Sequence, residues 1–211
     1  MNIKRLLVRC TLAVLAWSSL ASATIIFDVN STMTAGDPTQ LGRLTRNGVP
    51  SDWSTVKAFP GVTNASTSVH YEMFSIFVGL GNFLQIDFDD PGAAFFVSAY
   101  LGSYSPNPVA ANRGLDINYM GDAGFSGNSF GNPGFFQVVA PVNGTVIIVV
   151  NDPSTTNAAS GQSFHLTMES YIDTQFTDPP AGAPEPATAY LSLAGFLLLV
   201  VLMRRKRAST T

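Results

Sequence analysis

The densest group of carboxylates in the chain is formed by Asp87, Asp89 and Asp90. Alternate carboxylates at the end of a predicted strand could bind Ca²⁺, a hard cation that takes six to eight oxygen ligands. Asp116 and Asp122 could supply further oxygens. The spacing differs from that of an EF-hand, however, and Asp-Pro-Gly is ordinary turn chemistry. We therefore favour a solvated acidic turn and expect no cofactor, with calcium as the alternative.

The residues that could support catalysis are sparse. The two histidines, His70 and His165, fall in different predicted strands, and the sequence has neither a Gly-x-Ser-x-Gly elbow nor a His-Glu-x-x-His motif. The one cysteine, Cys10, lies in a segment that we expect to be removed. Two histidines without cysteine cannot close a structural zinc site unless carboxylates join them. We therefore expect no enzyme, and a Ser-His-Asp hydrolase is the catalytic alternative.

Three tyrosines, Tyr100, Tyr104 and Tyr119, occur near Asn and Asp residues in the middle of the chain. A β-sandwich can hold a sugar by stacking its apolar face on such rings while polar neighbours bind the hydroxyls. These tyrosines are therefore candidates for glycan stacking. The alternative, which we favour, is that they pack in the core or along a sheet edge.

The charge distribution separates the two ends of the chain from its middle. Of 11 Lys and Arg residues, four lie between Thr24 and Ala183, where 13 acidic residues give a net charge of −9. Such an acidic surface repels nucleic acid, so no nucleic-acid partner is expected. With 46% apolar residues, the chain is also expected to fold rather than to be disordered.

The N-terminus has the pattern of a secretory signal peptide. Lys4, Arg5 and Arg9 precede an apolar stretch, and Ala21 and Ala23 are the small residues of a cleavage site just before Thr24. The apolar stretch is shorter than the ~20 residues that span a bilayer, which disfavours the alternative of a permanent anchor. We expect export by the Sec translocon and removal of residues 1–23 by signal peptidase.

The C-terminus has a Pro-rich linker followed by an apolar segment, residues 187–203. As a helix with ~1.5 Å rise per residue, this segment would be about 25 Å long, enough to cross a membrane that thins slightly. A basic cluster follows at once, formed by Arg204, Arg205, Lys206 and Arg207. Basic clusters remain cytoplasmic, so the preceding domain is expected outside the inner membrane.

The three-part C-terminal pattern, which begins with Pro184-Glu185-Pro186 and continues through the apolar segment to the basic cluster, resembles the PEP-CTERM sorting signal of Gram-negative bacteria. The resemblance implies that an exosortase, a membrane-embedded transpeptidase-like cysteine enzyme, processes the chain close to Pro-Glu-Pro. It also implies association with exopolysaccharide and a final place at the cell surface or in the extracellular matrix. The alternative is a plain single-pass anchor with a Pro-rich stalk.

Between these ends the pattern is that of an all-β domain. Its apolar runs are short, rich in β-branched and aromatic residues, and separated by Gly- and Pro-containing turns, which predicts an antiparallel, jelly-roll-like β-sandwich. The predicted strands are 24–29, 68–78, 83–88, 93–101, 135–140, 145–151 and 163–171. The whole chain is thus divided into a signal peptide (1–23), a sandwich domain (24–178), a linker (179–186), a transmembrane helix (187–203) and a basic tail (204–211).

Two strands carry more detailed predictions. In 83–88, Leu84, Ile86 and Phe88 share one face, which indicates a half-buried strand. The strand 145–151 is apolar on both faces, so it should be central in its sheet. The turn 141–144 before it predicts an antiparallel hairpin with the strand 135–140.

The middle of the chain also resembles a recurrent β-sandwich module of secreted bacterial proteins. The segments that carry the likeness are Arg43–Pro50, Lys57–Gly61, Ala99–Tyr104, Asn118–Gly124 and Phe135–Pro141. The resemblance implies a domain without catalysis. Copies of the module often carry a cysteine pair, and here Trp53 and Leu84 stand near the corresponding positions, so a buried hydrophobic pair could substitute for the bridge.

Taken together, the sequence predicts an exported structural or adhesive protein of the cell surface or matrix. Its expected partners are the Sec translocon, signal peptidase, an exosortase, the inner membrane in transit and exopolysaccharide. The alternative is a carbohydrate-binding module that uses surface aromatics, with or without calcium.

Overall fold

The computed structural model of the chain describes residues 23–80, 82–90, 94–127, 134–152 and 161–172. The chain divides into two compact units, Met1–Thr177 and Asp178–Thr211, and all described residues belong to the first. The expectations for the signal peptide before Ala23, for the linker, for the transmembrane helix and for the basic tail therefore lie outside the described residues. Among the helices within them, none has the length and hydropathy to cross a membrane.

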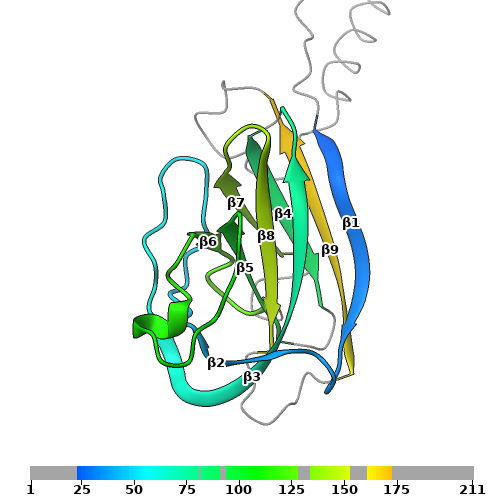
Figure 1. Ribbon diagram of the computed structural model, residues 1–211. Helices are drawn as coiled ribbons and strands as arrows, with labels where there is room; N and C mark the ends of the chain where they lie inside the picture. The colour runs from blue at the N-terminus through cyan, green and yellow to red at the C-terminus, as the bar shows by residue number, and fades with distance from the viewer. Residues whose placement is uncertain (1–22, 81, 91–93, 128–133, 153–160, 173–211) are drawn as a thin grey trace, which may run out of the picture. The chain divides into compact units, whose positions relative to one another are not determined.

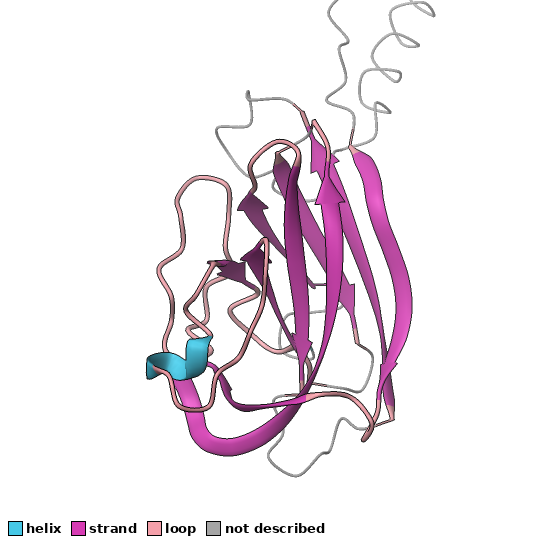
Figure 2. Ribbon diagram, in the orientation of Figure 1, coloured by secondary structure: helices cyan, strands magenta, loops and turns pink. Residues whose placement is uncertain are grey.

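Two antiparallel sheets make up the described domain, which is therefore all-β and has the layers of a β-sandwich (Figures 1 and 2). The four-stranded sheet has the order β1 (Thr24–Met33), β9 (Gln162–Tyr171), β4 (Phe83–Asp89), β7 (Gly134–Val139). The five-stranded sheet has the order β2 (Thr39–Leu44), β3 (Val62–Val78), β8 (Gly144–Asn151), β5 (Phe96–Leu101), β6 (Tyr119–Asp122). A short 3₁₀ helix, η1 (Ala111–Gly114), lies in the loop between β5 and β6.

All seven predicted strands are present, and two further strands, β2 and β6, were not predicted from the sequence. Strand β2 contains Gly42 at a positive φ of 76°, where its register with β3 shifts between Leu41 and Arg43. Strand β6 has four residues, two of which are Gly121 and Asp122. Glycine, aspartate and short length all weaken the strand pattern, so local sequence did not reveal either strand.

The main core lies between the two sheets. Leu84, Ile86 and Phe88 of β4 are buried in it, as the alternation predicted. From β8, Val146, Ile148 and Val150 enter the same core. Alternate residues of one strand thus face the same layer, which is the ordinary consequence of the pleat.

Strand β8 is central, as predicted, because β3 and β5 pair with its two edges. Its other face is apolar because Ile147 and Val149 are buried in a second cluster with Tyr100, on the outer face of the five-stranded sheet. The loop between β5 and β6 contributes Tyr104 to this cluster. This sheet is therefore covered on both faces.

The predicted hairpin between β7 and β8 is wrong. The turn itself exists, with a hydrogen bond from the Gly144 amide to the Pro141 carbonyl oxygen at 3.1 Å and with Asn143 at a φ of 57°. However, β7 pairs with β4 in one sheet, while β8 pairs with β3 and β5 in the other. Because the turn carries the chain from one layer to the other, it joins the sheets instead of closing a hairpin.

Candidate functional site

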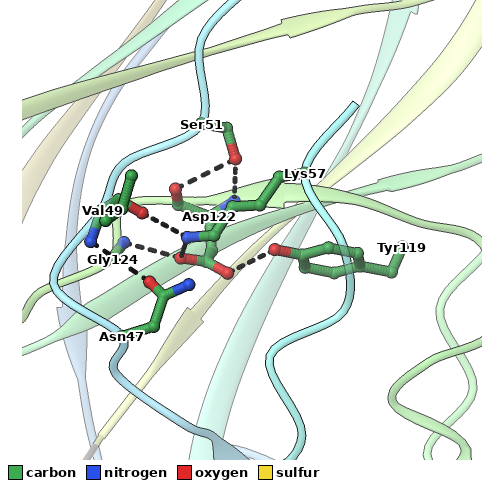
Figure 3. A network of polar contacts seen from close by, with 7 residues as sticks. All are labelled: Asn47, Val49, Ser51, Lys57, Tyr119, Asp122 and Gly124. Carbon is green, nitrogen blue, oxygen red and sulfur yellow. Dashed lines mark hydrogen bonds and ion pairs between the residues drawn. The ribbon is translucent and has the colours of Figure 1, made fainter. Parts of the chain in front are cut away.

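The most connected polar group in the described domain is the carboxylate of Asp122 at the end of β6 (Figure 3). Lys57, from the segment between β2 and β3, places its Nζ 2.5 Å from Asp122 Oδ1. The side chains are 9% and 0% exposed, respectively, so this ion pair is buried. We call Asp122 and its partners Lys57, Tyr119, Ser51 and Gly124 the Asp122 network.

The two charges are hydrogen-bonded by further groups. Asp122 Oδ1 also accepts the Gly124 amide at 2.6 Å, and Asp122 Oδ2 accepts the Tyr119 hydroxyl. Lys57 Nζ donates a second hydrogen bond to the Val49 carbonyl oxygen at 2.5 Å. A buried ion pair is tolerated when such additional bonds replace the lost hydration. Burial, together with the neighbouring Asp122 charge, raises the pKa of the Tyr119 phenol, so this hydroxyl remains a donor.

Ser51 connects the Asp122 network to both sheets. Its amide donates to the Asp122 carbonyl oxygen at 2.9 Å, and its Oγ accepts the Asp122 amide at 2.8 Å. Its own carbonyl oxygen accepts the amide of Gln137 in β7 at 2.9 Å. Since β6 and β7 are the edges of different sheets, Ser51 bridges the two layers at this side of the sandwich.

The Asp122 network brings together segments that carry the resemblance to the secreted bacterial module. Gly48 donates its amide to the Gly124 carbonyl oxygen at 3.1 Å, so the stretch after Arg43 lies against the stretch after Asn118. Lys57 supplies the third segment. The sequence alone does not predict that these segments form one site. The available signal was that Lys57 is one of four basic residues between Thr24 and Ala183.

The polar groups of the Asp122 network bind one another and therefore have a structural role. The ammonium group, the carboxylate and the serine hydroxyl are all engaged with each other or with backbone groups. A nucleophile or a metal ligand must be free to reach a substrate or an ion, and these groups are occupied internally. The arrangement therefore holds the segment between β2 and β3 onto β6 and β7.

A substitution at Gly124 tests how tightly the Asp122 network is packed. Its φ is +75°, and a Cβ built on it would lie 2.4 Å from the Val49 carbonyl carbon. A non-glycine residue in the left-handed region costs roughly 1–2 kcal/mol. Because the added Cβ would also clash with Val49, we expect Gly124→Ala to destabilise the domain by more than this. Urea unfolding measures this. The matched control is Gly102→Ala, because Gly102 has a φ of +72° with nothing within 4 Å of its Cβ position; equal losses for both variants would contradict the prediction.

A second feature, beside the Asp122 network, is the contact between Trp53 and Leu84. Trp53 Nε1 donates to the Leu84 carbonyl oxygen at 3.0 Å. The indole ring also packs edge-on against Phe83 and Tyr171, with ring centroids 5.7 and 5.2 Å away. The two residues that the sequence suggested as a buried hydrophobic pair are thus in contact. A hydrogen bond and aromatic packing join them here.

The three aspartates considered for calcium differ in their surroundings. Asp90 is 3% exposed, and its Oδ2 accepts the Phe95 amide at 2.9 Å, so this carboxylate joins the end of β4 to the residue before β5. Asp87 lies two residues before Asp89 in β4, and Gln85 Nε2 donates to both of its oxygens at 3.2 Å. Among the described residues, no three His, Cys, Asp or Glu side chains form a group suited to a metal ion. Calcium binding stays a prediction.

Asp87 and Asp90 have unusual titration behaviour. Burial raises the pKa of Asp87 to about 6. The hydrogen bond from Gln85 lowers this pKa, and the nearby Glu169 raises it. Burial also raises the pKa of Asp90 to about 6, while the Phe95 amide lowers it and Asp89 raises it. Both groups therefore hold a proton more tightly in the folded protein than in the unfolded chain.

This shift predicts a pH dependence of stability. The tighter binding of a proton by Asp87 in the folded state stabilises the domain. This stabilisation is complete below the ordinary pKa of 3.8 and is lost as the pH rises through about 6. We expect Asp87→Asn to increase the free energy of unfolding at pH 7 relative to the unmodified protein, with a much smaller effect at pH 4. Urea unfolding at the two pH values measures this, and Asp116→Asn, at an exposed position, is the control. An equal effect of Asp87→Asn at both pH values would contradict the assignment.

The two histidines lie in separate places. His165 Nε2 is 2.7 Å from Asp28 Oδ1 and 3.4 Å from Thr167 Oγ1. A catalytic relay uses the two ring nitrogens for different partners, whereas both contacts here involve Nε2. His70 is 8% exposed, and its Nδ1 is 3.0 Å from the Asp37 carbonyl oxygen.

The three tyrosines considered for glycan stacking are brought together. The ring centroids of Tyr100 and Tyr104 are 4.6 Å apart, and those of Tyr100 and Tyr119 are 6.1 Å apart. Tyr100 is 1% exposed, and burial raises the pKa of its phenol. The Tyr104 hydroxyl donates to Gln40 Oε1. The rings therefore pack on one another in this structure, and glycan stacking stays a prediction.

The processing motifs lie mostly outside the described residues, including Ala21, Pro184-Glu185-Pro186 and the basic cluster 204–207. Ala23 and Thr24 are described, and Thr24 is the first residue of β1, opposite Ser170 of β9. No protein-family model matches the chain, and no curated protein matches it.

Proposed function

We propose that this chain is an exported structural or adhesive protein of the bacterial cell surface or extracellular matrix, sorted by an exosortase and associated with exopolysaccharide. The observation that carries the proposal is the order of Pro184-Glu185-Pro186, an apolar segment and a basic cluster at the C-terminus. A signal-peptide pattern at the other end supports the same route. The Sec translocon would export the chain, signal peptidase would cut before Thr24, and the apolar segment would hold it in the inner membrane until the exosortase acts.

The described domain is compatible with this route. Cleavage before Thr24 leaves β1 whole, because Thr24 is its first residue. The hydrogen bonds and the ion pair of the Asp122 network hold one side of the domain together, and the mature chain would contain no cysteine. Its fold would therefore be independent of disulfide formation outside the cytoplasm. The net charge of −9 favours solubility in a hydrated matrix.

We further propose that the sandwich is a jelly roll. Its pairings are nested: β1 pairs with β9, β3 with β8, β4 with β7 and β5 with β6. Such nesting is what results when one long antiparallel ribbon wraps into two sheets, with β2 added beside β3. Jelly rolls occur in many proteins of unrelated activity, so the topology does not by itself define a function.

The mass of the mature protein from its native host tests the sorting proposal. We expect a species that begins at Thr24 and ends close to Pro184, measured by intact-mass and C-terminal peptide mass spectrometry. Extra mass on the new C-terminus would identify the attachment. An intact tail through Thr211 in the steady-state pool would overturn exosortase processing and leave a plain inner-membrane anchor.

A second candidate function is glycan binding, which the clustering of Tyr71, Tyr100, Tyr104 and Tyr119 favours. Tyr71 and Tyr104 are only partly buried, with ring centroids 5.4 Å apart. Retention on the host's exopolysaccharide would be compared for the unmodified protein and for Tyr71→Ala and Tyr104→Ala. Loss of retention in folded variants would support a binding module, and equal retention would count against it.

A further inference from the structure

One end of the sandwich exposes several large apolar side chains. These are Ile25 (58% exposed), Phe77 (64%), Leu80 (71%), Val139 (47%), Val142 (47%) and Ile172 (67%). We call these six residues the apolar end. Single exposed apolar residues are common on proteins, but a group of this kind at one place usually marks an interaction surface.

The strand register places these residues at the same end. In the four-stranded sheet, Phe83 lies opposite both Val139 and Tyr171, and Thr24 lies opposite Ser170. In the five-stranded sheet, Val78 lies opposite Gly144. Two hydrogen bonds then join the connection after β3 to the connection after β7. They run from the Asn143 amide to Gly79 O at 2.9 Å and from the Ala140 amide to Asn82 O at 2.8 Å. Figure 1 shows β1 starting and β9 ending at this end.

Charged side chains flank the segments that form the apolar end, with Asp173 directly after Ile172, but do not occur within them. The segments that form it are 24–27, 73–86, 138–151 and 170–172, and none contains a charged residue. The rest of the domain carries its net charge of −9. The nearest carboxylate in β9 is Glu169, whose Oε2 accepts the Tyr171 hydroxyl at 2.6 Å. An uncharged apolar surface can enter a lipid interface without the large cost of desolvating a charge.

The tether of the domain leaves from the same place. Ile172 belongs to the apolar end, and 14 residues, 173–186, separate it from the apolar segment that begins at Ala187. A flexible linker of this length has a root-mean-square span of about 20 Å, and an extended polyproline-type linker spans about 45 Å. If the segment 187–203 crosses a membrane, the apolar end therefore stays close to that membrane at a high effective concentration.

We propose that the apolar end is a lipid-contacting surface, which rests on the outer face of the bilayer that holds residues 187–203. This inference depends on the transmembrane segment of the proposed function. Leu80, Val142 and Phe77 enter the boundary between headgroups and acyl chains, where apolar side chains are favoured. The contact depends mainly on the burial of apolar side chains, because the basic group that the proposed cleavage places beside them is a single one, the new α-amino group of Thr24. It holds the domain in one orientation, with its C-terminal linker next to the membrane.

The test uses the chain from Thr24 to Thr211, the form expected after removal of the signal peptide, in nanodiscs of zwitterionic lipid that hold one molecule each. Because Cys10 is the only cysteine in the sequence and is absent from this form, single labelling sites can be introduced directly. An environment-sensitive fluorophore is attached at Leu80→Cys, at Leu198→Cys within the apolar segment, or at Val109→Cys. Val109 is the matched control, since it is 89% exposed and lies in the loop whose Arg113 contacts Ala65, at the opposite end of β3.

A quencher carried on the lipid is expected to reduce the fluorescence of the labels at Leu80 and Leu198, but not that at Val109. With the label moved to Val142→Cys, Leu80→Glu should abolish quenching, whereas Val109→Glu should leave it unchanged. Circular dichroism confirms that each variant is folded. If Leu198 is quenched while Leu80 behaves like Val109, the lipid contact is wrong and the transmembrane segment stands. If Leu198 is not quenched, the transmembrane segment is wrong and the inference is overturned with it.

Discussion

Replacement of Lys57 by methionine is expected to destabilise the domain by about 3–5 kcal/mol, the usual cost of removing one partner of a buried ion pair. The Asp122 carboxylate is fully buried, so it would remain as an uncompensated charge with only the Gly124 amide and the Tyr119 hydroxyl as donors. For a domain of this size, each kcal/mol lowers the melting temperature by roughly 2–4 °C, so a loss of about 6–20 °C is expected. Thermal and urea unfolding of the purified protein measure the effect.

The control for this prediction is the double variant Lys57→Met with Asp122→Asn. It removes both charges, while the asparagine side chain can still accept a hydrogen bond from Gly124. Replacement of a whole buried ion pair is usually far less costly than removal of one partner, so the double variant should recover part of the lost stability. The loss in Lys57→Met should also persist in high salt, because buried pairs are screened little. A loss below about 1 kcal/mol, as for exposed ion pairs, would show that the Asp122 network does not hold the domain together.

In two of the strands that were predicted from the sequence, β4 and β8, burial sets the pattern. Strand β4 alternates because one face meets the core, and β8 is apolar throughout because both faces are covered. Periodicity reports burial and therefore identified both strands. It does not report pairing partners, and for this reason the turn 141–144 predicted a hairpin, although the strands on either side of it belong to different sheets.

The Asp122 network could not be predicted because its contacts are long-range and mostly involve the backbone. Ser51 acts through its amide and carbonyl groups as well as its hydroxyl, and Val49 contributes only a carbonyl oxygen. Contacts through amide and carbonyl groups require no particular residue type, so they leave no motif. The part that does leave a signal is the charged pair, Lys57 and Asp122, which are 65 positions apart. Only the fold brings them together.

Replacement of Trp53 by alanine is expected to destabilise the domain by about 3–5 kcal/mol, the range for removal of a large buried aromatic side chain. The ring is 9% exposed and packs against Phe83 and Tyr171, and its Nε1 is the donor to the Leu84 carbonyl oxygen. Truncation therefore opens a cavity at the side of the four-stranded sheet and removes this donor. Because Ser51 lies two residues before Trp53, the bridge between β6 and β7 should weaken as well.

The conservative variant Trp53→Phe separates the two contributions of the tryptophan. It keeps an aromatic ring between Phe83 and Tyr171 but cannot donate to Leu84, so we expect a loss of about 1–2 kcal/mol, much of it from the hydrogen bond. Hydrogen exchange should show faster exchange of the Gln137 amide in Trp53→Ala than in Trp53→Phe, because that amide is bonded to the Ser51 carbonyl oxygen. Equal stability of the alanine variant and the unmodified protein would contradict this prediction and show that the contact between Trp53 and Leu84 does not stabilise the domain.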